Sequence, residues 1–313
     1  MLGHHAGKIS AGHRGGLRRS PAECVMDVVN VVFLTLVMLI CVFPFYYLFI
    51  NTISDNNLSA RGLILLYPRG IHFENYVQVF KISGIMQAAL ISLTRTVLGT
   101  ACSVAASAFL GYLLSKQNML GHKIVYRFII ITMYFNAGII PWYMNMMNLH
   151  LLNNFWVYII PYIVVPYNII LIKTYMEGIS PSLEDAAQID GAGYMVRFSR
   201  IVLPVCTPIL ATTAIFSAVG QWNSFQDTLF LVSKPELYTL QFLLYRYMNE
   251  ADALASIIKS AGSSEMLTNL TITQTPTSIK MTVSMIVVLP ILMVYPYFQR
   301  FFIKGIMIGA VKG

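Results

Sequence analysis

Six long apolar runs dominate the sequence and set the limits on its fold. They lie at about residues 28–50, 90–114, 124–144, 155–175, 203–222 and 281–303. A helix that crosses a bilayer needs about 20 consecutive apolar residues, and each run reaches that length. Only 11% of the chain is charged, whereas soluble domains carry about 25%. The runs therefore predict an all-α integral membrane protein with six transmembrane helices.

The distribution of Lys and Arg predicts which side of the membrane each loop faces. Six crossings place both termini on one side, and basic residues prefer the cytoplasm. With the amino terminus inside, the larger basic set is cytoplasmic: Lys8, Arg14, Arg18, Arg19, Lys116, Lys123, Arg127, Lys173, Arg197, Arg200, Arg300, Lys304 and Lys312. The smaller, outer set is Arg61, Arg69, Lys81, Lys234, Arg246, Lys259 and Lys280. We therefore expect both termini in the cytoplasm.

The chain divides into a tail and one membrane domain. Residues 1–24 are rich in Gly, His and Arg and lack apolar periodicity, so they predict a flexible cytoplasmic tail. Residues 25–313 predict the six-helix domain, with two long outer segments, residues 51–89 and 223–280. In the second of these we expect a short surface helix followed by a polar loop around residues 262–277. The helix is marked by apolar residues at helical spacing: Leu240, Leu243, Leu244 and Met248.

Some binding chemistries are not signalled by the composition. The net charge of +8 is spread along the chain without a basic cluster, so no nucleic-acid partner is expected. The histidines show no ligand spacing, and no metal site is expected. The cysteines have no short pairing, which indicates neither a disulfide framework nor a zinc site. They are Cys24, Cys41, Cys102 and Cys206.

Prolines inside the apolar runs predict kinks at Pro44, Pro161, Pro166, Pro208 and Pro290.

Charge gathers in one predicted cytoplasmic loop, residues 177–204. Ser180 followed by Pro181 is typical of a helix start, with the serine as the cap. Gly191 can supply the left-handed residue that ends this helix, and a second helix is expected from about Tyr194 towards Pro204. For Arg197 and Arg200 two interpretations are open, pairing with nearby acids or contact with lipid headgroups. The loop predicts a helix, a glycine turn and a second helix that returns to the membrane.

This loop resembles the signature loop of permease subunits of ABC-type importers. The family pattern is Glu-Ala-Ala, three residues, Gly, nine residues and Ile-x-Leu-Pro. Here Asp185 replaces the usual Glu, Gly191 keeps its place, and residues 201–204 read IVLP at the expected spacing. The stretches ENYVQVF (74–80), QWNSF (221–225) and the end of the chain (295–313) look like the carbohydrate-uptake branch. GIIPWYM (138–144) and the ending GAVKG look like permeases for oligosaccharides derived from polysaccharides.

The resemblance implies a subunit that forms half of a sugar pathway and works with partners. These would be a second, homologous permease, two cytoplasmic ATPase subunits and an external or periplasmic solute-binding protein, in a bacterial inner membrane. The chain has no Gly-x-x-x-x-Gly-Lys-Ser/Thr loop, so ATP and Mg²⁺ would be bound by the ATPase subunits. The residues expected to serve coupling are Glu184, Asp185, Ala186, Ala187, Asp190, Gly191, Ile201, Leu203 and Pro204.

Candidate solute-pathway residues combine amide groups and aromatic rings near the outer halves of the third and fifth runs. Arg95 is the one clear charge inside a run, where a charge is costly. It is expected either to extend to the interface or to contact solute or a neighbouring subunit. Trp and Tyr at such depths also form the ordinary interfacial belt. The candidates are Arg95, Tyr134, Asn136, Trp142, Asn145, Gln221, Trp222 and Asn223.

Two other classes of membrane protein compete with this interpretation. An ion-coupled secondary carrier is expected to show carboxylates inside its spans and inverted repeats, and neither is visible in the sequence. A membrane enzyme is expected to gather His, Asp or Glu at one depth, and the runs show no such cluster. The sequence therefore favours an ATP-driven importer subunit.

Overall fold

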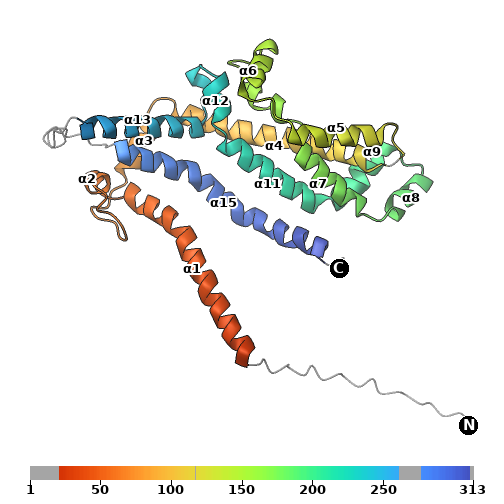
Figure 1. Ribbon diagram of the computed structural model, residues 1–313, viewed down its shortest axis with the longest axis horizontal. Helices are drawn as coiled ribbons and strands as arrows, with labels where there is room; N and C mark the ends of the chain where they lie inside the picture. Colours follow the sequence, from red (N-terminus) through yellow and green to blue (C-terminus); the bar gives the residue numbers. More distant parts are fainter. Residues whose placement is uncertain (1–20, 117, 261–275, 311–313) are drawn as a thin grey trace, which may run out of the picture. The chain divides into compact units, whose positions relative to one another are not determined.

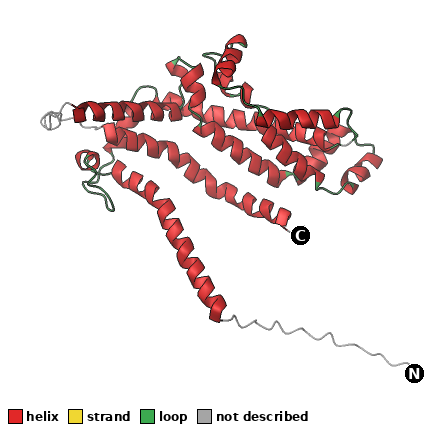
Figure 2. Ribbon diagram, in the orientation of Figure 1, coloured by secondary structure: helices red, strands yellow, loops and turns green. Residues whose placement is uncertain are grey.

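The computed structural model describes residues 21–116, 118–260 and 276–310 as helices joined by short connections (Figures 1 and 2). No strand is present in these three ranges, which confirms the all-α class. The chain forms two units, residues 1–47 and 48–313. The first contains most of helix α1 (Pro21–Thr52), whose start shows that residues 21–24 are helical and not part of a tail. All other described helices belong to the second unit.

Three continuous helices are long and apolar enough to cross a membrane: Val25–Thr52, Ile85–Ser115 and Thr277–Pro296. Three pairs of shorter helices pass the same test together, although each pair is bent. If each pair is one span, the described part of the chain reaches six. The bends are 119° between α5 (His122–Tyr134) and α6 (Ile139–Asn148), 43° between 155–162 and α7 (Pro166–Glu177), and 80° between 194–205 and α11 (Thr207–Asn223).

The third, fourth and fifth runs are each divided into two helical segments, and glycine and proline lie at the breaks. The bends before α7 and α11 fall next to Pro166 and Pro208, where kinks are predicted. Gly138, with φ of +88°, precedes α6. Pro166 and Pro208 stand in the first turn of α7 and α11, where a missing N–H costs nothing. Pro44 and Pro290 lie inside unbroken helices, α1 and α15 (Pro276–Ala310). The prolines therefore start some helices and leave others intact.

The centre of the second unit is α4 (Ile85–Ser115), which packs along both α7 and α11 (Figure 1). A row of small buried residues on α4 repeats every four positions, which lets helices approach closely. A Cβ on Gly99 would lie 2.7 Å from Nε2 of Gln221 in α11. A Cβ on Gly111 would lie 3.0 Å from Cγ2 of Ile172 in α7. The members of the row are Gly99, Ser103, Ser107 and Gly111.

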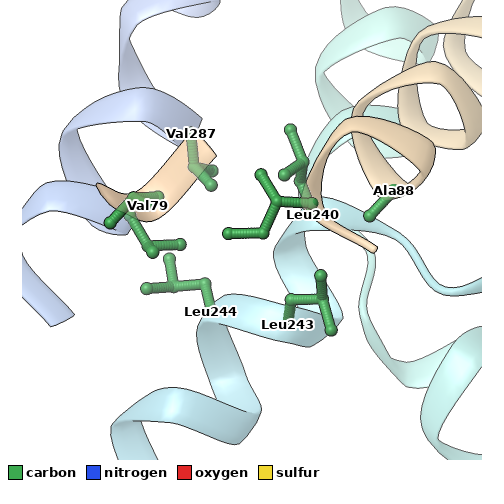
Figure 3. Close-up of a cluster of buried hydrophobic side chains, with 8 residues drawn as sticks. Val79, Ala88, Leu240, Leu243, Leu244 and Val287 are labelled. Carbon is green, nitrogen blue, oxygen red and sulfur yellow. The ribbon is translucent and has the colours of Figure 1, made fainter. Parts of the chain in front are cut away.

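Both long segments between spans contain helices. The first holds α2 (Asn56–Ala60) and α3 (Glu74–Lys81). The second holds α12 (Gln226–Leu231), the turn Pro235–Leu237 and α13 (Leu240–Ser260). The helix expected near Leu240 is longer than predicted and is not a surface helix at its start, because Leu240, Leu243 and Leu244 are buried against α3, α4 and α15 (Figure 3). Most of the loop expected at 262–277 lies outside the described residues. The cluster consists of Val79, Ile85, Ala88, Leu240, Leu243, Leu244, Val283 and Val287.

Candidate functional site: an elbow, a buried ion pair and a cavity

Residues 182–205, here named the elbow, form a helix, a turn and a second helical segment at one end of α4 (Figure 1). Helix α8 (Ser182–Ile189) is capped by Asp190 and followed by Gly191, whose φ of +80° confirms the left-handed residue predicted there. The N–H of Ala192 donates to the Ala187 carbonyl, and the N–H of Gly191 donates to that of Gln188. These two bonds satisfy carbonyls that the end of a helix leaves unpaired. The glycine turn is therefore built into the backbone.

The start of α8 differs in detail from the prediction. Pro181 occupies the capping position, and no side chain caps the helix there. The Ser180 hydroxyl lies 2.8 Å from that of Ser182 instead, so the serine cap was wrong. The returning segment runs through α9 (Tyr194–Val196), a π-helical turn (Arg197–Val202) and α10 (Leu203–Val205), as predicted.

Arg197 connects the second arm of the elbow to α8. Its Nη1 donates to Oε1 of Gln188 at 2.8 Å, and its guanidinium lies over the Tyr194 ring. Arg197 is 7% exposed, which argues against a contact with lipid headgroups. It also forms no ion pair within the part of the chain that the structure describes. Arg200 is exposed. The two arms of the elbow are thus joined by a direct hydrogen bond.

The residues expected to serve coupling differ in exposure: those on α8 are mostly exposed, and those of the returning segment are mostly packed. Asp185, Ala186 and Asp190 are exposed on α8, together with Ile189, which is 87% exposed. Glu184 instead turns inward and pairs with Lys116 at the end of α4. In the returning segment, Leu203 packs against a buried cluster that includes Tyr112 and Val202, Ile201 is half-buried and Pro204 is exposed. Ala187 is half-buried and Gly191 exposed.

A buried ion pair joins the other half of α4 to α12. Arg95 and Asp227 are in contact, with side chains 1% and 2% exposed. Arg95 also donates from Nε to Gln221 Oε1 at 2.8 Å and from Nη1 to the Ser224 carbonyl at 3.0 Å. The Tyr162 hydroxyl donates to Asp227 at 2.6 Å. The expectation that Arg95 extends to the interface is therefore wrong, because the pair neutralises the charge inside the protein.

A cavity of about 490 Å³ opens beside this ion pair, between α4, α7 and α11. Asn168 Nδ2 donates to the Ser217 hydroxyl at 3.0 Å, which in turn lies 3.5 Å from that of Ser103. Tyr167 and Phe216, 52% and 45% exposed, also line it. Polar groups lining a cavity within spans can contact water or solute, whereas lipid would leave them unsatisfied. The lining residues are Arg95, Ser103, Tyr162, Val165, Tyr167, Asn168, Phe216, Ser217, Gly220, Gln221 and Ser224.

The structure brings only two of the predicted pathway residues, Arg95 and Gln221, to this cavity. Trp222 points elsewhere, and its Nε1 donates to the Val287 carbonyl at 3.0 Å. Asn136 accepts a bond from the Gly138 N–H in the bend before α6. Tyr134, Asn145 and Asn223 are exposed and Trp142 packs in a separate apolar cluster.

Asp227 and Asn168 are functional candidates that sequence reasoning missed. Asp227 follows the expected end of the fifth run by five residues, so the apolar runs alone do not indicate a partner for Arg95. Asn168 interrupts an otherwise apolar run and could have been singled out for that reason. Serines such as Ser217 carry no comparable signal, because hydroxyls also bond to their own helix.

The fold and site can be compared with known proteins. Residues 103–308 match the family described as binding-protein-dependent transport system inner membrane component. Protein LplC of Bacillus subtilis (strain 168) is 32% identical, over 95% of this chain and 98% of its own. The polygalacturonan/rhamnogalacturonan transport system permease protein YtcP of the same organism is 30% identical, over 90% and 96%. A crystal structure of a bacterial ABC transporter involved in the import of the acidic polysaccharide alginate gives a TM-score of 0.79 at 28% identity, covering 91% and 99%.

The fold and these matches define a membrane permease subunit of a binding-protein-dependent ABC importer. This chain belongs to the binding-protein-dependent transport system inner membrane component family. It is a transport component and not an enzyme, and the alternative of an ion-coupled carrier is not supported. The family assignment implies a membrane location and a solute-binding protein that works with the permease.

Proposed function

We propose that this subunit forms half of a pathway for a sugar or oligosaccharide and takes its driving energy from a cytoplasmic ATPase through the elbow. The observation that carries the proposal is the exposed face of α8 beside Gly191, formed by Leu183, Asp185, Ala186 and Ile189. In this proposal both termini and the elbow lie in the cytoplasm, as the distribution of basic residues predicts.

The exposed face of α8 has the chemistry of a docking surface. Leu183 and Ile189 are 46% and 87% exposed, and apolar groups of this kind gain free energy when a partner covers them. Asp185 and Asp190 are exposed beside them and have no ion pair among the described residues, so they are available to basic groups of the partner. Ala186 has a small side chain that lets a partner approach closely.

An ATPase is the expected source of energy because this chain has no phosphate-binding loop of its own. Moving a two-state gate from 1:99 to 99:1 needs about 5.5 kcal/mol of differential binding. ATP and Mg²⁺ bound between two ATPase subunits would provide it as these subunits close. The complete assembly would then contain this subunit, a homologous permease, two ATPases and a solute-binding protein.

The cavity beside the ion pair is the proposed solute contact of this subunit. Sugars present hydroxyls to hydrogen-bonding groups and apolar ring faces to aromatic side chains, and the cavity offers Asn168, Ser217, Tyr167 and Phe216. Arg95 brings no unpaired charge to it, because Asp227 neutralises the guanidinium. The cavity is therefore suited to hydroxyl groups. The related permeases named for polygalacturonan, rhamnogalacturonan and arabinooligosaccharides support an oligosaccharide as cargo.

Uptake into membrane vesicles that contain the complete assembly tests this proposal. We expect uptake of labelled oligosaccharides from pectin or arabinan to require internal ATP and the solute-binding protein. An ionophore that collapses the ion gradients should leave uptake unchanged. Uptake that continues without ATP and stops with the ionophore would refute the proposal.

A further inference from the structure

Two physical routes lead from the elbow into the membrane core, and they differ in stiffness. The covalent route passes through α10 into α11, but the chain bends by 80° at this junction. Helix α4 offers a second route through side-chain contacts. It is continuous over 31 residues and contains no proline. A bent junction can absorb movement, whereas a straight helix transmits it along its axis.

Glu184 fastens the elbow to α4. One carboxylate oxygen pairs with Lys116 Nζ, and the other accepts a hydrogen bond of 3.1 Å from the Tyr112 hydroxyl. The Lys116 and Glu184 side chains are 27% and 17% exposed, so water screens this pair less than a surface pair. Lys116 also lies over the Tyr112 ring, at 4.6 Å from its centre. Glu184 is thus held by Tyr112 of α4 and by Lys116, which caps the end of that helix.

Aromatic packing fixes the second arm of the elbow to the same part of α4. The Tyr112 ring is 2% exposed and lies 5.0 Å from that of Phe198, measured between centroids. Phe109 meets Phe198 edge to face at 5.8 Å. Glu184 and Phe198 thus connect the two arms of the elbow to this end of α4, and the Arg197–Gln188 hydrogen bond connects the arms to each other.

The far half of α4 is held by the buried ion pair. Arg95 lies 17 residues before Tyr112, which is about 25 Å along a helix at 1.5 Å per residue. It binds Asp227 and Gln221, and its guanidinium lies over the Tyr158 ring at 4.6 Å. Arg95 also lines the cavity. A displacement of α4 at the elbow therefore reaches the cavity wall without crossing a helix break.

We propose that α4 is a transmission rod and that the Lys116–Glu184 pair, with Tyr112, is the joint that attaches it to the elbow. Glu184 is then a positioning residue that acts within this chain, whereas Asp185 and Asp190 are left to face the ATPase. The inference rests on the proposed coupling function, because only a docked ATPase would move the elbow. It assigns Glu184 a different role from that expected for its neighbour Asp185.

Charge reversal in the complete assembly, purified through a tag on this chain, tests the joint. Hydrogen–deuterium exchange is compared with and without MgATP and vanadate at the elbow and in the far half of α4, residues 85–99. In Lys116→Glu or Glu184→Lys, we expect the ATPase and the elbow response to remain. The response in residues 85–99 should be largely lost, because the elbow no longer holds the end of α4. The reversed pair, Lys116→Glu with Glu184→Lys, should restore most of it, because the ion pair can form again in the opposite sense.

Two further variants keep the test decisive. Lys123→Glu reverses an exposed charge in the helix that follows and should leave the response unchanged. If the charge variants fail to assemble, Tyr112→Phe removes only the hydroxyl that binds Glu184 and should still weaken the response of residues 85–99.

The outcomes separate the joint from the proposed function. An unchanged response of residues 85–99 in both single variants would overturn the joint. The Glu184→Lys assembly could also lose its ATPase, and the reversed pair could fail to restore it. That result would overturn the joint and make Glu184 a docking residue, in agreement with the proposed function. A wild-type assembly that contains no ATPase would overturn both.

Discussion

Arg95 of α4 and Asp227 of α12 form an ion pair in the interior of the second unit, where their side chains are 1% and 2% exposed. Residues 132 positions apart are thereby joined beside a cavity lined by three helices. The cost of a charge within a membrane protein is offset by this partner and by the bonds of Arg95 to Gln221 and Ser224. The pair thus stabilises the cavity wall.

Breaking this pair should destabilise the protein strongly. Arg95→Met leaves the Asp227 carboxylate buried without its counter-ion, which is expected to cost about 3–5 kcal/mol. The double variant Arg95→Met with Asp227→Leu removes both charges and should recover most of that loss. Thermal unfolding of the purified assembly measures both effects. Arg246→Ala is the control, because Arg246 and Glu250 form an exposed pair, 48% and 54%, worth at most about 0.5 kcal/mol. Equal losses in Arg95→Met and Arg246→Ala would contradict this account.

Gly111 should tolerate no larger side chain, because α4 and α7 touch there. A Cβ would lie 3.0 Å from Ile172 and 3.2 Å from the backbone nitrogen of Lys173. Gly111→Val is expected to destabilise by about 1–3 kcal/mol through overpacking. Gly220→Ala is the matched control, since it lies in helix α11 with nothing within 4 Å of an added Cβ. The melting temperature should fall only for Gly111→Val, and an equal fall in both would show that this helix contact is looser than described.

The elbow turn should depend on the backbone conformation of Gly191 and not on space around it. An added Cβ would meet nothing within 4 Å, but φ is +80°. Valine in this region is strained by about 1–2 kcal/mol, whereas asparagine adopts it more readily. Gly191→Val should therefore lower the amount of ATPase that copurifies with the assembly, and Gly191→Asn should lower it less. Asparagine as harmful as valine would argue against backbone strain as the cause.

The cavity prediction can be tested through two polar side chains that line it. Asn168→Leu with Ser217→Ala removes both members of a hydrogen bond, a change that can be nearly neutral for stability. If these groups bind solute, uptake should fall by about 2- to 12-fold per lost bond of 0.5–1.5 kcal/mol. Thr212→Val is the control, because it removes an α11 hydroxyl that bonds to the Pro208 carbonyl and lies outside the cavity lining. Unchanged uptake in the double variant would remove this cavity from the solute path.

The helical class and the elbow could be predicted from the sequence because their signals are local. Apolar length indicates a span, and the conformation of Gly191 follows from its position in a short motif. The bends were less predictable. A run such as 124–144 meets the length of one span, yet Gly138 within it allows a 119° change of direction.

The ion pair and the cavity could not be predicted, because they depend on contacts between distant segments. Arg95 was recognised as costly, but its partner lay beyond the end of an apolar run. Glu184 and Asp185 are adjacent in sequence and looked equivalent. Consecutive side chains of a helix point in different directions. The Glu184 side chain therefore faces Lys116, whereas that of Asp185 is exposed. Only the packing of α8 on α4 separates the two roles.

Crosslinking from Ile189 tests the central claim, that the elbow faces the cytoplasm and contacts an ATPase. Ile189 is 87% exposed, so Ile189→Cys changes no internal packing. In membranes from cells in which the native cysteines of this chain are replaced, a maleimide that carries a photoreactive benzophenone should attach to Cys at this position and, on illumination, insert into a C–H bond of the ATPase. A membrane-impermeant maleimide added outside intact cells should leave it unmodified. Labelling from outside, or the absence of any ATPase adduct in membranes that contain the assembled complex, would contradict the account.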